Sequence, residues 1–230
     1  MRQQRPRGTT TRDSVVSAAL GVVDQVGLPA LTIRAVAAAV NAPPMSLYTH
    51  FSTKEELIDL MYVAVADRLY VDSGHDTWQA ELSALGHHVR ETLLAHPRWA
   101  PILSRPSTPT AVGVRERVLA MMVANGFSAP AALSGLSSVV LSTIGLVLVE
   151  LTFRDADGGS TLSGRFERLK ALFDSDAARG SAPTTSEAFA RVPAFDLSAH
   201  FDFSLRTLIS GLECSNPGQM GASQPSSSSS

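Results

Sequence analysis

Two hydroxyl-bearing residues, Ser46 and Thr49, flank the apolar Leu47 in the segment Pro-Met-Ser-Leu-Tyr-Thr-His. On a helix, both hydroxyls face away from Leu47 and can donate or accept hydrogen bonds at base edges in a DNA major groove. Pro44 and Met45 share that outward side and offer apolar surface for a thymine methyl group. These residue types at this spacing indicate a surface able to read base sequence.

Cationic and polar side chains flank this segment. Tyr48, His50 and Lys54 suit phosphate oxygens, contacts that position a protein on DNA without reading its sequence. Arg34 is the long base-capable donor upstream, and its guanidinium can bind guanine through two hydrogen bonds. The predicted DNA-binding residues are Thr32, Arg34, Pro44, Met45, Ser46, Tyr48, Thr49, His50 and Lys54.

Two short helices separated by Asn-Ala-Pro-Pro must hold these side chains in place. Thr32 can cap the first helix through its hydroxyl, and Asn41 tolerates the left-handed conformation that ends a helix. Pro43 is pushed extended by the proline after it and suits an N-cap. Pro44 then pre-sets the first turn of a helix expected over 44–50. The pattern predicts a helix-turn-helix, whose second helix enters the major groove.

Amphipathic segments on both sides complete a helical head. From Thr11, apolar residues recur at helical spacing as far as Gly27, which supplies a stop signal. Ser52 followed three residues later by Glu55 matches a capping box. It predicts a long helix that ends before the Gly/Asp/Ser-rich cluster at 71–76.

The same pattern has a plainer interpretation. Two short helices joined by a turn also occur in proteins that never contact DNA, and Tyr48 could belong to a hydrophobic core. A helical binding module without DNA affinity is therefore an alternative. Such a module has no salt-dependent affinity for any duplex, whereas a DNA-binding head loses affinity steeply as salt rises.

Charge is unevenly distributed along the chain. The 230 residues have a formal net charge of −2, yet residues 1–54 carry six Arg or Lys against two Asp, a net of +4, which leaves −6 for the remainder. A basic head on an acidic body indicates that the head meets a polyanion. Cys214 is the one cysteine, which excludes an intrachain disulfide and a cysteine zinc site.

Beyond residue 76 the chain reads as helical, with no strand pattern and no internal repeat, so the predicted fold class is all-α. Helices are expected from Trp78 to His96, around 111–125, over 130–153 and over 196–213. The apolar run LSSVVLSTIGLVLVEL is shorter than a membrane span, and Asp13 and Asp24 interrupt the N-terminal segment where a signal core would lie. We therefore expect a cytoplasmic protein that does not enter a membrane.

The stretch LTIRAVAAAVNAPPMSLYTHFSTKEELIDLM resembles the DNA-binding head of tetracycline-repressor-like (TetR) regulators. The shared features are Leu-Thr-x-Arg, an alanine-rich second helix, Leu-Tyr-x-His-Phe and Lys-Glu-x-Leu, in register over 11–70. Asn41 stands where the family usually has glycine, and Pro43 where a capping serine is common. The resemblance implies a homodimeric, ligand-responsive transcriptional regulator, usually a repressor of a near-palindromic operator in double-stranded DNA. An activator would share every one of these features.

A weaker resemblance extends into the body and implies a helical domain for ligand binding and dimerisation. The expected organisation is a flexible basic arm at 1–10, a three-helix helix-turn-helix domain with its connecting helix at 11–70, the ligand and dimer domain at 71–214, and a disordered Ser-rich tail at 215–230. Helices 130–153 and 196–213 from two chains are expected to pack as a four-helix bundle. The expected partners are an operator, a second copy of the chain and a small organic effector, with no cofactor.

The family's drug and magnesium ligands can be placed on this chain by the resemblance. Tyr70 falls at the family's histidine, Leu85 at its asparagine, Leu103 near its metal-binding histidine and Val149 near its acidic metal partner. Because a hard cation needs oxygen or nitrogen ligands, a magnesium–tetracycline complex is not the expected effector. The predicted pocket residues are Tyr70, Leu85, Val89, Trp99, Leu103, Leu141 and Val149.

Other polar signals do not indicate catalysis or metal binding. The adjacent His87 and His88 point to different helix faces, so they cannot form the i, i+4 pair that metal sites favour. No Gly-x-Ser-x-Gly elbow or phosphate-binding glycine loop is present, and we expect no enzyme activity. Trp78 and Trp99 could line a pocket or fill a core. Glu150, within an apolar helix, could contact ligand, pair at a dimer interface or lie exposed.

Overall fold

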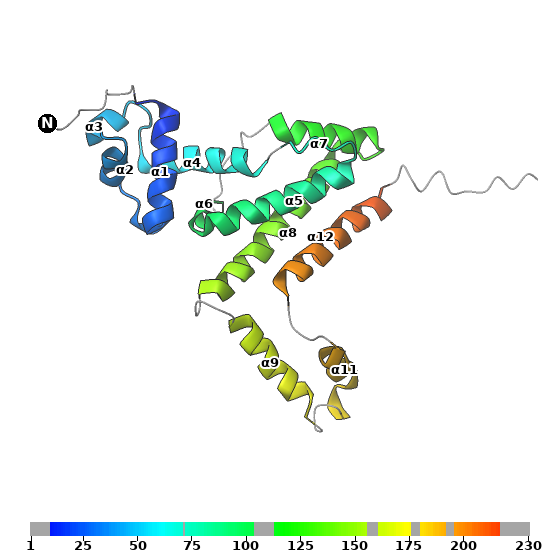
Figure 1. Cartoon of the computed structure of the whole chain (residues 1–230). Coiled ribbons are helices and arrows are strands. Elements are labelled where there is room, and N and C mark those ends of the chain that lie inside the picture. Colours follow the sequence, from blue (N-terminus) through cyan, green and yellow to red (C-terminus); the bar gives the residue numbers. More distant parts are fainter. Residues whose placement is uncertain are drawn as a thin grey trace, which may run out of the picture.

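The computed structural model describes residues 10–70, 72–103, 113–155, 161–175, 180–191 and 196–216. Within these ranges the chain is helical and contains no β-strand, which confirms the predicted all-α fold. A small helical head lies at one end of the molecule, and α4 (Lys54–Leu69) leads from it into a larger body of crossing helices (Figure 1).

The head consists of α1 (Arg12–Val26), the 3-10 turn η1 (Leu28–Ala30), α2 (Ile33–Ala39) and α3 (Pro44–Leu47). Gly27 ends α1 with φ 80°, and Asn41 follows α2 with φ 53°, the left-handed conformation expected of it. Pro43 is the extended N-cap of α3, with φ −63° and ψ 140°, and Pro44 opens the helix. The two prolines therefore separate α2 from α3 as the sequence predicts.

The third helix is shorter than the predicted range 44–50. It ends at Leu47, and residues 48–50 continue as a turn in which the His50 amide donates to the Leu47 carbonyl at 2.9 Å. This three-residue step is the tighter 3-10 pattern that commonly closes short helices. Leu47 is 0% exposed, so the short helix is fixed by one deeply buried side chain.

The start of α4 corrects the predicted capping box by one residue. Thr53, rather than Ser52, is the N-cap, and its hydroxyl accepts from the Glu56 amide at 3.1 Å. The Glu56 carboxylate accepts in turn from the Ser52 amide at 2.6 Å. Thr53 and Glu56 repeat the spacing and residue types of Ser52 and Glu55, so a local pattern cannot separate the two registers.

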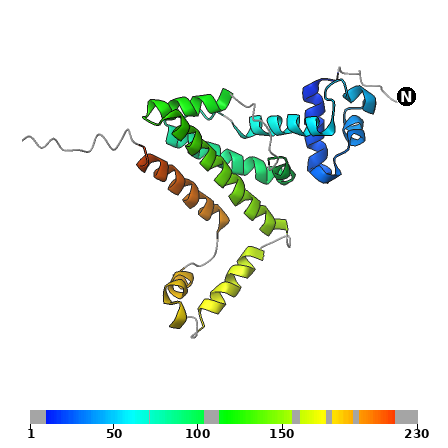
Figure 2. The same cartoon turned by 180° about the vertical axis from the view of Figure 1, so that it is seen from behind.

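The body is built from α5 (Trp78–Ala95), η2 (Pro97–Trp99), α6 (Ala100–Leu103), α7 (Gly113–Ala124), α8 (Ala129–Asp155) and α12 (Leu197–Cys214). Helix α8 runs beside α5, and α12 lies against both (Figures 1 and 2). Two glycines permit this close approach of α12. A Cβ on Gly86 would lie 2.8 Å from the Leu205 side chain, and one on Gly135 would lie 3.0 Å from Leu212.

Helix α8 is longer than expected, and the prediction that its apolar stretch is too short for a membrane span was wrong. Its segment Ala129–Thr152 is long and apolar enough to cross a bilayer. The segment nevertheless carries Glu150, which is 4% exposed and accepts two hydrogen bonds, each 3.1 Å, from the Arg90 guanidinium of α5. A buried ion pair and neighbours on several sides mark α8 as the core helix of the body.

A helical arm, defined as α9 (Thr161–Phe173) and α11 (Pro183–Arg191), projects from the end of α8 away from the other helices (Figures 1 and 2). Three aromatic rings hold the arm together. Phe173 and Phe189 stack at 5.0 Å, and Phe166 lies 5.4 Å from Phe189. Leu172 of α9 is 65% exposed, so the arm presents apolar surface of its own.

Candidate nucleic-acid interface and effector cavity

The side chains on the outward side of α3 are exposed to solvent. Met45 is 77% exposed, and Pro44, Ser46 and Thr49 are also exposed, while Leu47 points into the head. The Ser46 hydroxyl donates to the Pro43 carbonyl at 2.7 Å, and the Thr49 hydroxyl donates to the Ser46 carbonyl at 2.7 Å. Both oxygens keep lone pairs for accepting, so they are ready acceptors for base amino groups.

Tyr48 is not a core residue. Its side chain is 46% exposed, while its ring lies 5.8 Å from the buried ring of Phe51. The alternative placement of Tyr48 in the core was therefore wrong. The ring therefore contacts the head while nearly half of the side chain stays exposed beside α3.

The remaining predicted DNA-binding residues surround α3. Thr32 is exposed and caps α2, with its hydroxyl accepting from the Ala35 amide at 3.1 Å. Arg34 is exposed on the first turn of α2, whereas His50 and Lys54 are half-buried at the junction between α3 and α4. All nine predicted residues thus lie on α2, on α3 with the turn that follows, or at the start of α4.

Helix α1 fixes the position of α3. The Arg12 Nε donates to the His50 carbonyl at 3.1 Å, and Arg12 Nη2 lies 3.5 Å from the Glu56 carboxylate. One side chain therefore connects the first residue of α1 to the turn after α3 and to the start of α4. Sequence reasoning missed this role of Arg12 because its partners are 38 and 44 residues away.

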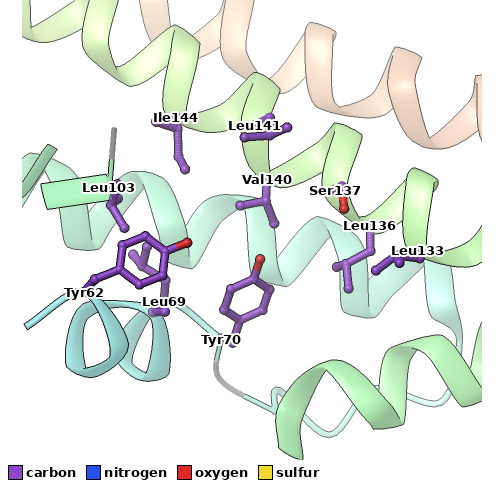
Figure 3. Close-up of a pocket in the computed structure, with 11 residues that line it drawn as sticks. Tyr62, Leu69, Tyr70, Leu103, Leu133, Leu136, Ser137, Val140, Leu141 and Ile144 are labelled. Carbon is purple, nitrogen blue, oxygen red and sulfur yellow. The ribbon is translucent and has the colours of Figure 1, made fainter. Parts of the chain in front are cut away.

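A cavity of about 220 Å³ lies between α4 and α8 (Figure 3). Its described lining residues come from α4 and its C-cap, from α6 and from α8. They are Tyr62, Ala66, Leu69, Tyr70, Leu103, Leu133, Leu136, Ser137, Val140, Leu141 and Ile144. On both long helices these positions recur every three or four residues, so each helix presents one continuous face to the cavity.

The structure brings three of the seven predicted pocket residues into this cavity: Tyr70, Leu103 and Leu141. Leu85, Val89 and Trp99 are buried in the core without lining it, and Val149 is 49% exposed on α8. Tyr62 and Ser137 were missed. Tyr62 lies on α4 about two helical turns before the predicted Tyr70, which is the C-cap of that helix, so helical periodicity could have indicated it.

The head is joined to the body around Trp99. The His96 ring stacks on the Trp99 indole at 3.8 Å, and its Nδ1 lies 3.0 Å from the Asp24 carboxylate of α1. The Arg68 guanidinium of α4 lies over the same indole, 5.1 Å from the ring centroid. Arg98 donates to the Asp24 carbonyl at 2.9 Å. Contacts from α1 and α4 therefore converge on one short segment of the body.

The loop between α4 and α5 is bonded to two helices of the body, α5 and α7. Glu81, 5% exposed, accepts from the Ser73 amide at 2.8 Å and from the His75 amide at 3.0 Å. From α7, Arg117 pairs with the Asp72 carboxylate and donates to the His75 carbonyl at 2.9 Å. We call these contacts the linker clamp. The loop that follows α4 is thereby attached to α5 and α7.

The histidines examined as metal ligands have other partners. His87 lies 3.1 Å from the Asp202 carboxylate, and His88 Nε2 lies 2.8 Å from the Arg68 carbonyl. Among the described residues, no group of three or more His, Cys, Asp or Glu side chains is placed to hold a metal ion. Glu150 is 4% exposed and pairs with Arg90 of the same chain, a partner that was not predicted, and the alternative that it lies exposed was wrong.

An exposed recognition helix, a supporting three-helix head and a body that contains a cavity define a helix-turn-helix, ligand-responsive transcription regulator. A family model described as "Tetracyclin repressor-like, C-terminal domain" matches residues 72–215, and one described as "Bacterial regulatory proteins, tetR family" matches residues 15–61. The chain belongs to the tetracycline-repressor (TetR) family of transcriptional regulators.

Three similar proteins place the chain within this family. An HTH-type transcriptional regulator of Saccharopolyspora erythraea is 34% identical, over 92% of this chain and 88% of the relative. The HTH-type transcriptional repressor DrrR1 of Streptomyces coeruleorubidus is 31% identical, over 96% and 83%. The structure of the Streptomyces coelicolor TetR family protein ActR in complex with actinorhodin is similar in fold, with a TM-score of 0.73 and 22% identity over 91% of this chain and 100% of ActR.

Proposed function

We propose that the chain is a repressor that binds a near-palindromic operator as a homodimer and leaves it when a small organic molecule occupies the cavity. The observation that carries the DNA-binding part is the outward projection of α3, with Met45 77% exposed and Leu47 fully buried beneath it. One of the similar proteins is named a repressor, which supports repression over activation. The ligand complex of ActR supports an organic effector.

In this proposal, α3 lies in the major groove and its neighbours hold the phosphate backbone. Ser46 and Thr49 accept hydrogen bonds from cytosine or adenine amino groups, and Met45 contacts a thymine methyl. Tyr48 and Lys54 bind phosphate oxygens on one side of the groove, and Thr32 binds them on the other. These contacts from α2 and α4 set the orientation in which α3 reads the bases.

The exposed apolar side chains of α8 and α12 support dimerisation. Leu148 and Val149 of α8 are 41% and 49% exposed, and Phe203 of α12 is 60% exposed. Burying such surface against a second copy is favourable by about 25 cal/mol per Å². Two copies of α8 and α12 form a four-helix bundle in this arrangement. The dimer then places its two α3 helices about 34 Å apart, one turn of DNA.

Helix α4 couples the cavity to the head. Its N-terminal turn is bonded to the head through Glu56, and its C-terminal end supplies Leu69 and the C-cap Tyr70 to the cavity, roughly 20 Å away along the helix. An effector that fits the cavity only when α4 is displaced therefore shifts the head as well. To move a bound population from 99:1 to 1:99, it must favour the displaced state by about 5.5 kcal/mol.

Selection of DNA from a randomised duplex library by the purified chain tests this function. The proposal predicts enrichment of an inverted repeat whose half-sites are centred about 10 base pairs apart or a multiple of that spacing. Enrichment of a single unpaired half-site would contradict the dimeric arrangement. Recovery of unchanged random sequence would contradict DNA recognition altogether.

A further inference from the structure

A groove of about 330 Å³ lies between α1 and α4, on another face of α4 than the cavity described above. Val16 of α1 and Leu60 and Val63 of α4 supply apolar surface, and the groove is also lined by Asp13 of α1 and Asp67 of α4. Positions 60, 63 and 67 recur every three or four residues, so α4 turns one continuous face to the groove. The described lining residues all belong to α1 and α4, which places the groove in the head and its connecting helix.

Two arginines also line the groove, and both are engaged by other groups. Arg12 donates to the backbone after α3 and lies 3.5 Å from the Glu56 carboxylate. The Arg68 guanidinium lies over the Trp99 indole, 5.1 Å from the ring centroid. Neither cation is therefore left to neutralise the carboxylates of the groove.

The carboxylates of Asp13 and Asp67 are the charged groups that an occupant would meet. Both residues are exposed, and no hydrogen bond or ion pair joins either carboxylate to another described residue. An arginine side chain matches this lining, because its methylene stem covers apolar surface while its guanidinium pairs with a carboxylate through two hydrogen bonds. The groove therefore fits a segment that is rich in arginine.

The chain carries such a segment directly before α1. Residues 1–9 lie outside the described residues, and their sequence contains Arg2, Arg5 and Arg7 with no acidic side chain. These three arginines supply half of the six Arg and Lys residues counted over residues 1–54. The basic charge of the head and the free carboxylates of the groove are thus complementary.

The segment is long enough to follow the groove. The described chain begins at Thr10, three residues before Asp13. The eight residues from Thr10 back to Arg2 span at most roughly 27 Å. The stretch from Leu60 to Asp67 occupies only about 10 Å of α4. Arginines of the segment can therefore reach both carboxylates.

Attachment to α1 offsets the weakness of surface ion pairs. An exposed ion pair by itself contributes little, but a short tether holds the segment at an effective concentration on the order of millimolar. A segment with an intrinsic dissociation constant of about the same size then occupies the groove about half of the time. A duplex binds arginines through its phosphates, so it must draw the segment out of the groove.

We propose that the groove between α1 and α4 is the docking site of the chain's own arginine-rich segment, residues 1–9, and that a DNA duplex competes with the groove for the same arginines. The competition rests on the DNA-binding function proposed above, whereas the docking does not. Docked arginines pair with Asp13 and Asp67 and are withheld from phosphates. Since non-specific binding depends almost entirely on phosphate contacts, docking disfavours duplexes that α3 does not read.

Disulfide trapping in the full chain tests the docking. Cys214→Ser removes the exposed native thiol, Gln4→Cys places a thiol in the segment, and Val63→Cys places its partner in the groove. In the matched control Ser14→Cys takes the place of Val63→Cys, because Ser14 is exposed, nearer to the segment along the chain and outside the groove. With oxidised glutathione and without DNA, the Val63 variant should cross-link within one chain roughly fivefold faster than the control.

Neutral groove variants extend the trapping experiment. Asp13→Asn together with Asp67→Asn should remove the difference between the two cross-linking rates, and circular dichroism verifies that each variant is folded. Equal rates before neutralisation, or a cross-link that joins two chains, overturns the docking. A difference in rate that survives both exchanges overturns the role of the carboxylates.

Affinity for a random-sequence duplex tests the competition, at about 0.15 M salt where direct repulsion over more than about 8 Å is screened. Asp13→Asn with Asp67→Asn should tighten binding roughly threefold or more, because the segment is released. In a chain that also carries Arg2→Gln, Arg5→Gln and Arg7→Gln, the same two exchanges should alter binding by no more than about 1.5-fold. An equal gain in both backgrounds would assign the effect to direct repulsion of the duplex and overturns the competition.

Docking and regulation fail on different observations. A chain that enriches an inverted repeat but cross-links equally at Val63 and Ser14 contradicts the docking and keeps the regulator function. A chain that cross-links preferentially at Val63 but binds no duplex contradicts the regulator function and keeps the docking site.

Discussion

The hydroxyls of Ser46 and Thr49 are donors to backbone carbonyls within their own helix turn, at 2.7 Å each. Turning either hydroxyl toward a base acceptor would break that bond. Accepting from a base leaves the local bond intact. We therefore expect both residues to favour base edges that carry amino groups, which in the major groove are cytosine N4 and adenine N6.

Ser46→Ala tests this expectation on single base pairs. The variant should lose roughly three- to tenfold preference for cytosine or adenine at one position of each half-site, and other positions should keep their preference. Competition binding with a set of singly substituted operators measures the change. Ser17→Ala on α1, also exposed but away from α3, is the matched control. A uniform loss across all operators would assign Ser46 to the backbone instead.

Side-chain exposure on α3 could be predicted from the sequence, but membership of the cavity could be predicted only in part. Leu47 is the single large aliphatic side chain within α3, so helical geometry fixes which neighbours face outward. For the body, an apolar pattern does not distinguish side chains that pack together from those that line a space. Val89 and Leu103 look alike in sequence, yet only Leu103 lines the cavity.

Among the secondary-structure elements, α4 connects the largest number of functional features. Its start is bonded to Arg12 of α1, its middle and end line the cavity, and the loop after it is held by the linker clamp. The sequence could predict the helix and its approximate limits, because capping residues and periodicity are local signals. It could not predict the linker clamp, since Arg117 and Asp72 are 45 residues apart.

Arg117→Gln tests the linker clamp. Without the guanidinium, the loop at residues 72–76 loses its contact with α7, so displacement of α4 is absorbed by the loop. Operator affinity without effector should stay within about twofold of the wild type. The effector concentration that releases half of the operator should rise roughly three- to thirtyfold, the range of coupling changes expected for such positions.

Fluorescence anisotropy of a labelled operator, titrated with effector, measures that release. Arg191→Gln is the control, because Arg191 pairs only one turn away with Glu187 on the exposed α11. The clamp has no coupling role if Arg117→Gln releases the operator at the wild-type concentration of effector. Loss of operator binding in the absence of effector would instead assign Arg117 to the stability of the fold.

For the whole molecule, two features indicate a second copy of the chain as partner. Exposed apolar residues on α8 and α12 lack covering helices in the described chain, and the head has one recognition helix where an inverted repeat requires two. The multi-faced apolar pattern of α8 allowed a dimer surface to be predicted from the sequence. The exposed residues that form it depend on how α5 and α12 pack on α8, which no local pattern contains.

Phe203→Asp tests the dimer surface. A carboxylate at this position would be buried without a partner in the four-helix bundle, so the variant should sediment as a monomer at micromolar concentration. It should also lose most of its operator affinity, because the two half-sites are no longer bound together. Val123→Asp, at a 45% exposed position on α7, should remain dimeric. A dimeric Phe203→Asp chain would place the interface elsewhere.

Binding of the operator by α3 and its neighbours is measured most directly by anisotropy titrations at several salt concentrations. For the wild type, the logarithm of the affinity should fall linearly with the logarithm of the salt concentration. Lys54→Gln should lower the slope by about one, and Tyr48→Ala should weaken binding at every salt concentration with the slope unchanged. An affinity that does not depend on salt, or wild-type binding by both variants, would contradict recognition of DNA by this surface.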